Sequence, residues 1–94
     1  MDNAVGTTLI DNERVKVTRW HFKPGAHTGW HRHEYDYVVV PITTGQLHLK
    51  EPGNTERTVD ITLGVPYARN VGVEHDVINP SKDKDVIFIE VEMK

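Results

Sequence analysis

Short segments in which apolar and polar residues alternate, separated by turn residues, run through almost the whole sequence. These segments cover 7–10, 14–22, 35–42, 46–51, 56–63, 65–69, 73–79 and 86–93. No stretch longer than about ten residues keeps apolar residues at helical spacing without an interrupting Pro or Gly. About eight short strands at regular spacing predict an all-β fold, either an antiparallel sandwich or a barrel.

The composition excludes several classes of protein. The chain has 94 residues, which predicts one domain spanning 1–94 that buries little surface and favours a partner chain. The formal net charge is −3 and the 11 Lys and Arg are scattered, which argues against a nucleic-acid partner. No apolar run is long enough to cross a membrane and no leader-like segment begins the chain, so we expect a cytoplasmic protein. Because there is no cysteine, any metal must be held by nitrogen and oxygen ligands.

Two histidines, His31 and His33, stand one residue apart just before the apolar run YVVVPI. Residues two apart in a strand face the same side, about 6.6 Å apart along the chain, so two imidazoles can converge on one ion. The pair alone is a weak signal, because partly exposed histidines at a strand start have the same pattern. His75 opens another strand after the turn NVG and supplies a third candidate ligand. His27 is either a fourth ligand, a group that orients a ligand, or a loop histidine in solvent.

Two segments resemble the sequence motifs of the cupin superfamily. The segment GAHTGWHRHEYDYVVVPITTG (25–45) is similar to the first motif: glycine, five residues, His-x-His, a carboxylate after three or four residues, and a final glycine. The segment GVPYARNVGVEHDVIN (64–79) is similar to the second, with Asn70 where the family usually has proline. The residues at the spacings of the second motif are Gly64, Gly72, His75 and Asn79. The resemblance implies a cupin-type antiparallel β-barrel, or jelly roll, with a site for a divalent metal ion inside it.

The first motif departs from the family at its carboxylate. That position falls on Tyr37, or on Val38 if one more residue intervenes, and neither residue carries a carboxylate. Simple alternation from His33 puts Tyr35 and Tyr37 on the inner face of the strand, and it puts Asp36 outside unless a bulge turns it inward.

The expected site is therefore a three-histidine centre of His31, His33 and His75, with His27 as a candidate fourth ligand and the Tyr37 phenol as a neighbour or weak fourth group. Three-histidine members of the cupin superfamily exist as a minority, some of them iron oxygenases, so the missing carboxylate does not abolish metal binding. Without a negative ligand the site would be more Lewis acidic and would accept Zn, Fe, Ni or Mn.

Aromatic and charged side chains elsewhere in the chain have their own expected positions. Trp30, Tyr67 and Phe88 are expected to pack in the barrel interior. Arg19 and His21 share one face of their strand, and that face either lines the barrel pocket or turns to solvent.

Two functions follow from this site. The first is a metal-dependent enzyme, an oxygenase, isomerase or lyase acting on a small molecule, in which Tyr37 or Asp36 moves a proton. The alternative is a non-catalytic cupin that binds or senses a small ligand. Inward polar groups around the ion, such as Arg19, His21 or Arg69, would favour the enzyme, and an apolar pocket would favour the binding protein. A third hypothesis is a cupin scaffold that no longer binds metal.

The expected partners are a small molecule and a second copy of the chain. Small cupins resemble one another in pairing as homodimers, through strand edges or an outer sheet face. The candidate segments for this contact are 7–10 and 86–93.

Overall fold

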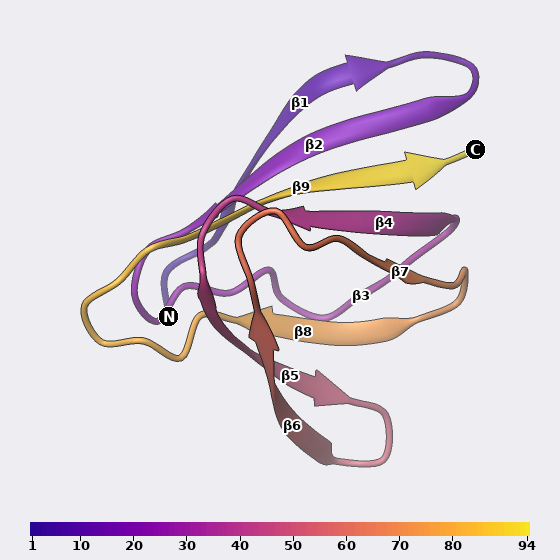
Figure 1. The fold of residues 1–94 in the computed structure, drawn as a ribbon. Coiled ribbons are helices and arrows are strands. Elements are labelled where there is room, and N and C mark those ends of the chain that lie inside the picture. The colour runs from indigo at the N-terminus through magenta and orange to yellow at the C-terminus, as the bar shows by residue number, and fades with distance from the viewer.

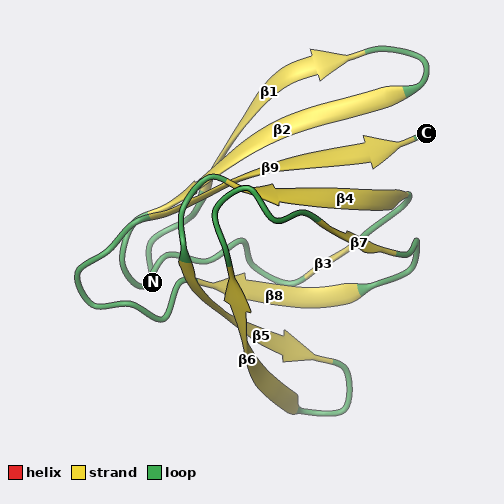
Figure 2. Cartoon of the chain, viewed as in Figure 1, coloured by secondary structure: helices red, strands yellow, loops and turns green.

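A computed structural model describes residues 1–94 and contains strands but no helix (Figures 1 and 2). The strands are β1 (Val5–Asp11), β2 (Val15–Phe22), β3 (His31–Arg32), β4 (Asp36–Pro41), β5 (Gly45–Glu51), β6 (Thr55–Ile61), β7 (Tyr67–Arg69), β8 (Glu74–Ile78) and β9 (Val86–Met93). Five strands form a large sheet in the order β1-β2-β9-β4-β7, and four form a small sheet in the order β3-β8-β5-β6. All neighbouring strands are antiparallel, as the alternating pattern predicted. The structure has no helix that is long and apolar enough to span a membrane.

Alternate residues of both sheets point into the space between them and form one core. Phe22, Val39 and Phe88 enter it from the large sheet, and Leu47 and Val77 enter it from the small sheet. In Figure 1 the large sheet lies above β8, β5 and β6, with the chain passing between the two sheets several times. The inner faces of the two sheets are therefore the walls of the barrel.

The inner face of β2 is the one that carries Thr18 and Phe22, both of which are buried. Arg19 and His21 consequently point to the outside of the large sheet. There the His21 Nε2 atom lies 2.7 Å from a carboxylate oxygen of Asp85. Neither Arg19 nor His21 belongs to the barrel interior.

One of the aromatic predictions is wrong. Trp30 is 54% exposed, because it precedes the first residue of β3, where the loop is not yet paired. Tyr35 lies in the bend between β3 and β4 and is 37% exposed, but it lines the interior cavity, as alternation predicted. Phe88 lies in the core and Tyr67 packs against the core, as expected.

The place of β9 in the sheet limits how the segment 86–93 could contact a second copy of the chain. β9 pairs with β2 on one side and with β4 on the other, so both of its edges already form backbone hydrogen bonds within the sheet. The segment 86–93 therefore cannot extend the sheet into a second copy of the chain. The edge strand at that end of the large sheet is β1, which contains the other candidate segment, 7–10.

A buried asparagine ties the loops at one end of the barrel together. Asn79 is fully buried, and its Nδ2 atom donates to the backbone carbonyls of Phe22 (3.2 Å), Lys23 (3.3 Å) and Lys84 (2.8 Å). Its Oδ1 atom accepts a hydrogen bond from the backbone N–H of Ser81 at 3.0 Å. The side chain thus fixes the ends of β2, β8 and β9 relative to one another.

Candidate metal centre

Backbone pairing places the three histidines on one face. His31 and His75 are opposite each other in the β3–β8 ladder, so their side chains project to the same side, with ring centroids 4.7 Å apart. His33 follows directly after β3; its N–H donates to Val73 O (2.8 Å) and its carbonyl accepts from Gly72 N–H (2.9 Å). Gly72 has φ +91°, a conformation that a residue with a Cβ adopts only under strain. The turn before β8 therefore holds His33 beside the other two histidines.

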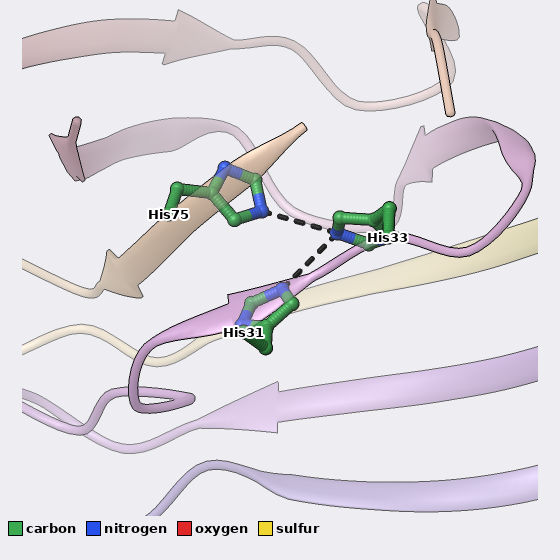
Figure 3. Close-up of side chains that lie close together, drawn as sticks. All are labelled: His31, His33 and His75. Atoms are coloured by element: carbon green, nitrogen blue, oxygen red, sulfur yellow. Dashed lines mark hydrogen bonds between the residues drawn. The ribbon is translucent and has the colours of Figure 1, made fainter. Parts of the chain in front are cut away.

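The Nε2 atoms of the three rings converge on one another (Figure 3). The Nε2 atom of His33 lies 3.1 Å from the Nε2 atom of His31 and 3.1 Å from that of His75. An imidazole nitrogen carries either one proton or one lone pair, so it forms one ordinary hydrogen bond. Hydrogen bonding among the rings therefore does not account for both contacts, whereas three lone pairs directed at a common ion would.

The spacing of these nitrogens fits a first-row divalent metal. Metal–nitrogen bonds of about 2.0–2.1 Å that meet at roughly 90–109° separate two ligand nitrogens by roughly 2.8–3.4 Å. The ligand atoms of His31, His33 and His75 all lie within 4.8 Å of one another. The three histidines predicted from the sequence thus form a group that could hold a metal ion.

The loop before β3 selects the tautomer of the His31 ring. Its Nδ1 atom lies 2.9 Å from the carbonyl oxygen of Gly29 and 3.2 Å from Thr28 Oγ1. Because a carbonyl only accepts, Nδ1 carries the proton and Nε2 presents a lone pair to the cluster. Gly29 has φ +84°, and the bend at this residue turns its carbonyl back toward the ring of His31.

Burial keeps the other two imidazoles neutral. Desolvation, with a smaller contribution from the neighbouring His31, lowers the pKa of His33 to about 4. Desolvation, followed by the charges of His31 and His33, lowers the pKa of His75 to about 3. The Nδ1 atom of His75 is buried without a hydrogen-bond partner, so pairing of β8 and packing hold this ring in place. Neutral imidazoles at pH 7 are the form that binds metal.

A buried carboxylate that the sequence did not reveal lies behind His33. Glu90 on β9 is 7% exposed; its Oε2 atom accepts a hydrogen bond from Trp20 Nε1–H at 3.0 Å, and its Oε1 atom is 3.6 Å from His33 Nδ1. Burial raises the pKa of Glu90 to about 7, although the Trp20 hydrogen bond acts in the opposite direction. Since the carboxylate faces the nitrogen remote from the cluster, it is placed to orient the His33 ring.

The three histidines line a cavity of about 770 Å³. Tyr37, at the position where the family motif has its carboxylate, stacks on His33 with ring centroids 3.8 Å apart and planes 15° apart. Its side chain is buried and its hydroxyl group has no hydrogen-bond partner. Apolar side chains such as Leu47 and Leu49 line the cavity together with charged ones, among them Arg69.

The remaining candidate residues lie outside this cluster. His27 is not part of it, because its Nδ1 atom is paired with the carboxylate of Asp76, at 3.0 and 3.1 Å from the two oxygens. The same carboxylate accepts a hydrogen bond from Gly29 N–H at 3.0 Å, so His27 and Asp76 brace the loop before His31. Asp36 does not line the cavity: it is exposed, and its Oδ1 atom accepts from the backbone N–H of Val71 at 2.7 Å.

Comparison with known proteins decides the family. No family model matches the sequence. A protein of Pseudomonas aeruginosa named beta-alanine degradation protein BauB is 50% identical over 91 residues, which make up 97% of this chain and 94% of that protein. The crystal structure of a cupin domain from Bordetella pertussis is 56% identical, covers 99% of this chain and 95% of that chain, and superposes with a TM-score of 0.94. The chain belongs to the cupin family.

Solved structures of lower sequence identity share the same fold. A cupin superfamily protein from Desulfitobacterium hafniense is 11% identical and covers 99% of this chain and 80% of that chain, with a TM-score of 0.74. A Klebsiella pneumoniae protein with a double-stranded β-helix domain is 17% identical and covers 97% and 76% of the two chains, with a TM-score of 0.78. The cupin barrel expected from the two sequence motifs is therefore confirmed.

Proposed function

We propose that this cupin is a metal-dependent enzyme that acts on a small molecule in the degradation of β-alanine. The observation that carries the proposal is the convergence of three Nε2 atoms, two of them 3.1 Å from the Nε2 atom of His33, at the wall of a cavity. His31, His33 and His75 would hold the ion. The ion would act as a Lewis acid on the bound molecule, and its identity would set the reaction class, an oxygenase with iron and an isomerase or lyase with zinc, nickel or manganese.

The polar groups around the triad favour an enzyme over a binding protein. Burial raises the pKa of Tyr37 above its ordinary value, so its hydroxyl keeps its proton and can donate a hydrogen bond to a bound molecule. Glu90, whose pKa burial raises to about 7, can gain or lose a proton near neutral pH. Arg69 faces the cavity from β7. An apolar pocket that only binds a ligand would not need these three groups.

The relative named for β-alanine degradation supports the choice of substrate. It is 50% identical over nearly the whole of both chains, and we infer that this cupin works in the same process. β-Alanine and the products of its breakdown are small, mostly charged molecules, which the cavity of about 770 Å³ admits easily.

The proposal is tested by proton NMR of substrate mixtures. Protein loaded in turn with Fe, Zn, Ni or Mn would be incubated with β-alanine and with three-carbon amino, oxo and hydroxy acids. We expect at least one compound to be consumed by the parent and by His21→Ala, which removes a histidine outside the barrel, but not by a His31→Ala/His75→Ala double variant. Consumption that persists in the double variant would refute the metal-dependent reaction. No consumption with any ion would favour the non-catalytic binding protein.

A further inference from the structure

Arg69 has an arrangement that the metal centre does not explain. Arg69 is opposite Tyr37 in the β4–β7 ladder, so both side chains project to the inner face, and both line the cavity. The guanidinium group donates no hydrogen bond within the chain, and its nearest acid is Glu51, 3.9 Å from Nη2. Glu51 is already engaged by Arg57, at 2.7 Å from Nε and 3.4 Å from Nη2. Arg69 therefore presents a planar set of unused donors to the cavity.

A second unused donor lies on the same face. The hydroxyl group of Tyr37 is buried and has no partner, and leaving a buried polar group unpaired costs about 1–3 kcal/mol. Arg69 is the direct cross-strand neighbour of Tyr37 in the β4–β7 ladder. Two donors, one of them cationic, thus lie side by side with no acceptor between them.

The acids of the cavity do not fill this position. Glu92 is opposite Lys16 in the β2–β9 ladder and opposite Tyr37 in the β4–β9 ladder, but its carboxylate forms no hydrogen bond with Tyr37 and no ion pair with Arg69. Glu90 accepts the hydrogen bond of Trp20 and faces the Nδ1 atom of His33. Asp60 and Glu34 also line the cavity, but both are exposed side chains. A bound anion would therefore supply the hydrogen-bond acceptor that Arg69 and Tyr37 lack.

We propose that Arg69 and Tyr37 form a carboxylate-binding site, so that the molecule taken up by the cavity is a small carboxylic acid. The guanidinium group would bind both carboxylate oxygens through parallel N–H donors, and the Tyr37 hydroxyl would donate to one of them. Because Tyr37 stacks on His33, the rest of the acid would extend along the three-histidine cluster. The inference rests on the proposed function only in taking this acid to be the substrate.

The test compares propionate with propionamide, which has the same shape and no charge, by isothermal titration of the full chain. Metal-free and zinc-loaded protein would be titrated separately, because a carboxylate can also bind an ion directly. We expect propionate to bind metal-free parent protein more tightly than propionamide by about 10-fold or more, since hydrogen bonds to charged groups are about twice as strong as neutral ones. Equal binding of the two probes to the metal-free parent would overturn the inference.

Variants of Arg69 and Tyr37 test whether these two side chains cause the preference for propionate. We expect Arg69→Gln to abolish the preference for propionate over propionamide, and Arg69→Lys to keep part of it because the charge remains. Tyr37→Phe keeps the stacked ring and should weaken propionate binding about 2- to 10-fold. Arg19→Gln, which removes an arginine outside the barrel, should leave it unchanged. An unchanged preference in Arg69→Gln would overturn the inference. Zinc titration of the parent separates the two proposals. A parent that binds zinc but shows no preference for propionate overturns only this inference, and a parent that shows the preference but binds no zinc overturns only the metal-dependent function.

Discussion

At the scale of single residues, the barrel interior differs from an ordinary core because it contains two neighbouring ionisable side chains, His33 and Glu90, whose pKa values are shifted by burial. Burial favours the neutral form of each, and so it lowers the pKa of His33 to about 4 and raises that of Glu90 to about 7. The histidines contribute stability that is present above their unfolded pKa of about 6.5 and is lost as the pH falls toward about 3–4. Glu90 contributes stability that is present below about 4.5 and is lost as the pH rises toward about 7.

These opposite signs predict how Glu90→Gln changes the pH dependence of folding. Between about pH 4.5 and 6.5 the metal-free parent gains stability from His33 and His75 with rising pH, while Glu90 cancels part of the gain. Removing the acid should roughly double the slope of unfolding free energy against pH in this window. Urea unfolding of metal-free protein at a series of pH values measures both slopes. Equal slopes would show that Glu90 does not titrate in the folded state between these pH values.

A second residue-scale prediction concerns His27. Because its ring is paired with Asp76 and lies outside the cluster, His27→Ala should still bind one zinc ion per chain. The loss of the hydrogen-bonded pair should lower the free energy of unfolding by about 1 kcal/mol. Zinc titration and urea unfolding give the two numbers. Loss of zinc stoichiometry in this variant would make His27 a ligand after all.

The sequence predicted the three clustered histidines but not the carboxylate beside them. His31 and His33 are separated by the strand period, and His75 stands at a motif spacing, so local rules sufficed. Alternation from Phe88, which was expected inside, would have put Glu90 on the inner face too, but Ile87 and Ile89 make the other face of β9 equally apolar, and a glutamate in the core was not expected. Only the position of β9 between its neighbours decides which face is buried.

At the scale of strands and loops, Asn79 is the side chain on which the end of the barrel most depends. Asn79→Ala removes four hydrogen bonds and leaves three carbonyls without this donor, so we expect the free energy of unfolding to fall by about 2–4 kcal/mol. Asn70→Ala, at an exposed position before the other end of β8, should change it by about 0.5 kcal/mol or less. Urea unfolding of both variants checks the difference. Similar losses in the two variants would contradict the structural importance of Asn79.

Most of the strands could be predicted from the sequence, but the short strand β3 and the bend between β3 and β4 could not. The predicted segments from 14–22 onward correspond to β2 and to β4 through β9, because alternation and turn residues mark their ends. The two-residue strand β3 is too short to produce a pattern, and the bend after it leaves Tyr35 37% exposed although this residue lines the cavity. Tyr37, on β4, is buried, as alternation predicted.

At the scale of the whole molecule, the outer face of the large sheet suggests how two copies would meet. An apolar row crosses it, in which Ile10, Val17, Val91 and Val38 are successive partners on β1, β2, β9 and β4. We expect a homodimer that covers this row, because a barrel of this size gains stability by burying it. Sedimentation equilibrium should give twice the chain mass for the parent and the chain mass for Val17→Lys. A monomeric parent would contradict this expectation.

The central claim is that the three-histidine cluster holds a divalent metal ion, and elemental analysis tests it most directly. Protein would be purified without an affinity column, beside the His31→Ala/His75→Ala double variant and the His21→Ala control. The account predicts close to one Fe, Ni, Mn or Zn ion per chain in the parent and the control, and loss of this ion in the double variant. A parent that contains no such metal, and whose unfolding temperature does not rise when each of these ions is added at pH 7.5, would contradict it.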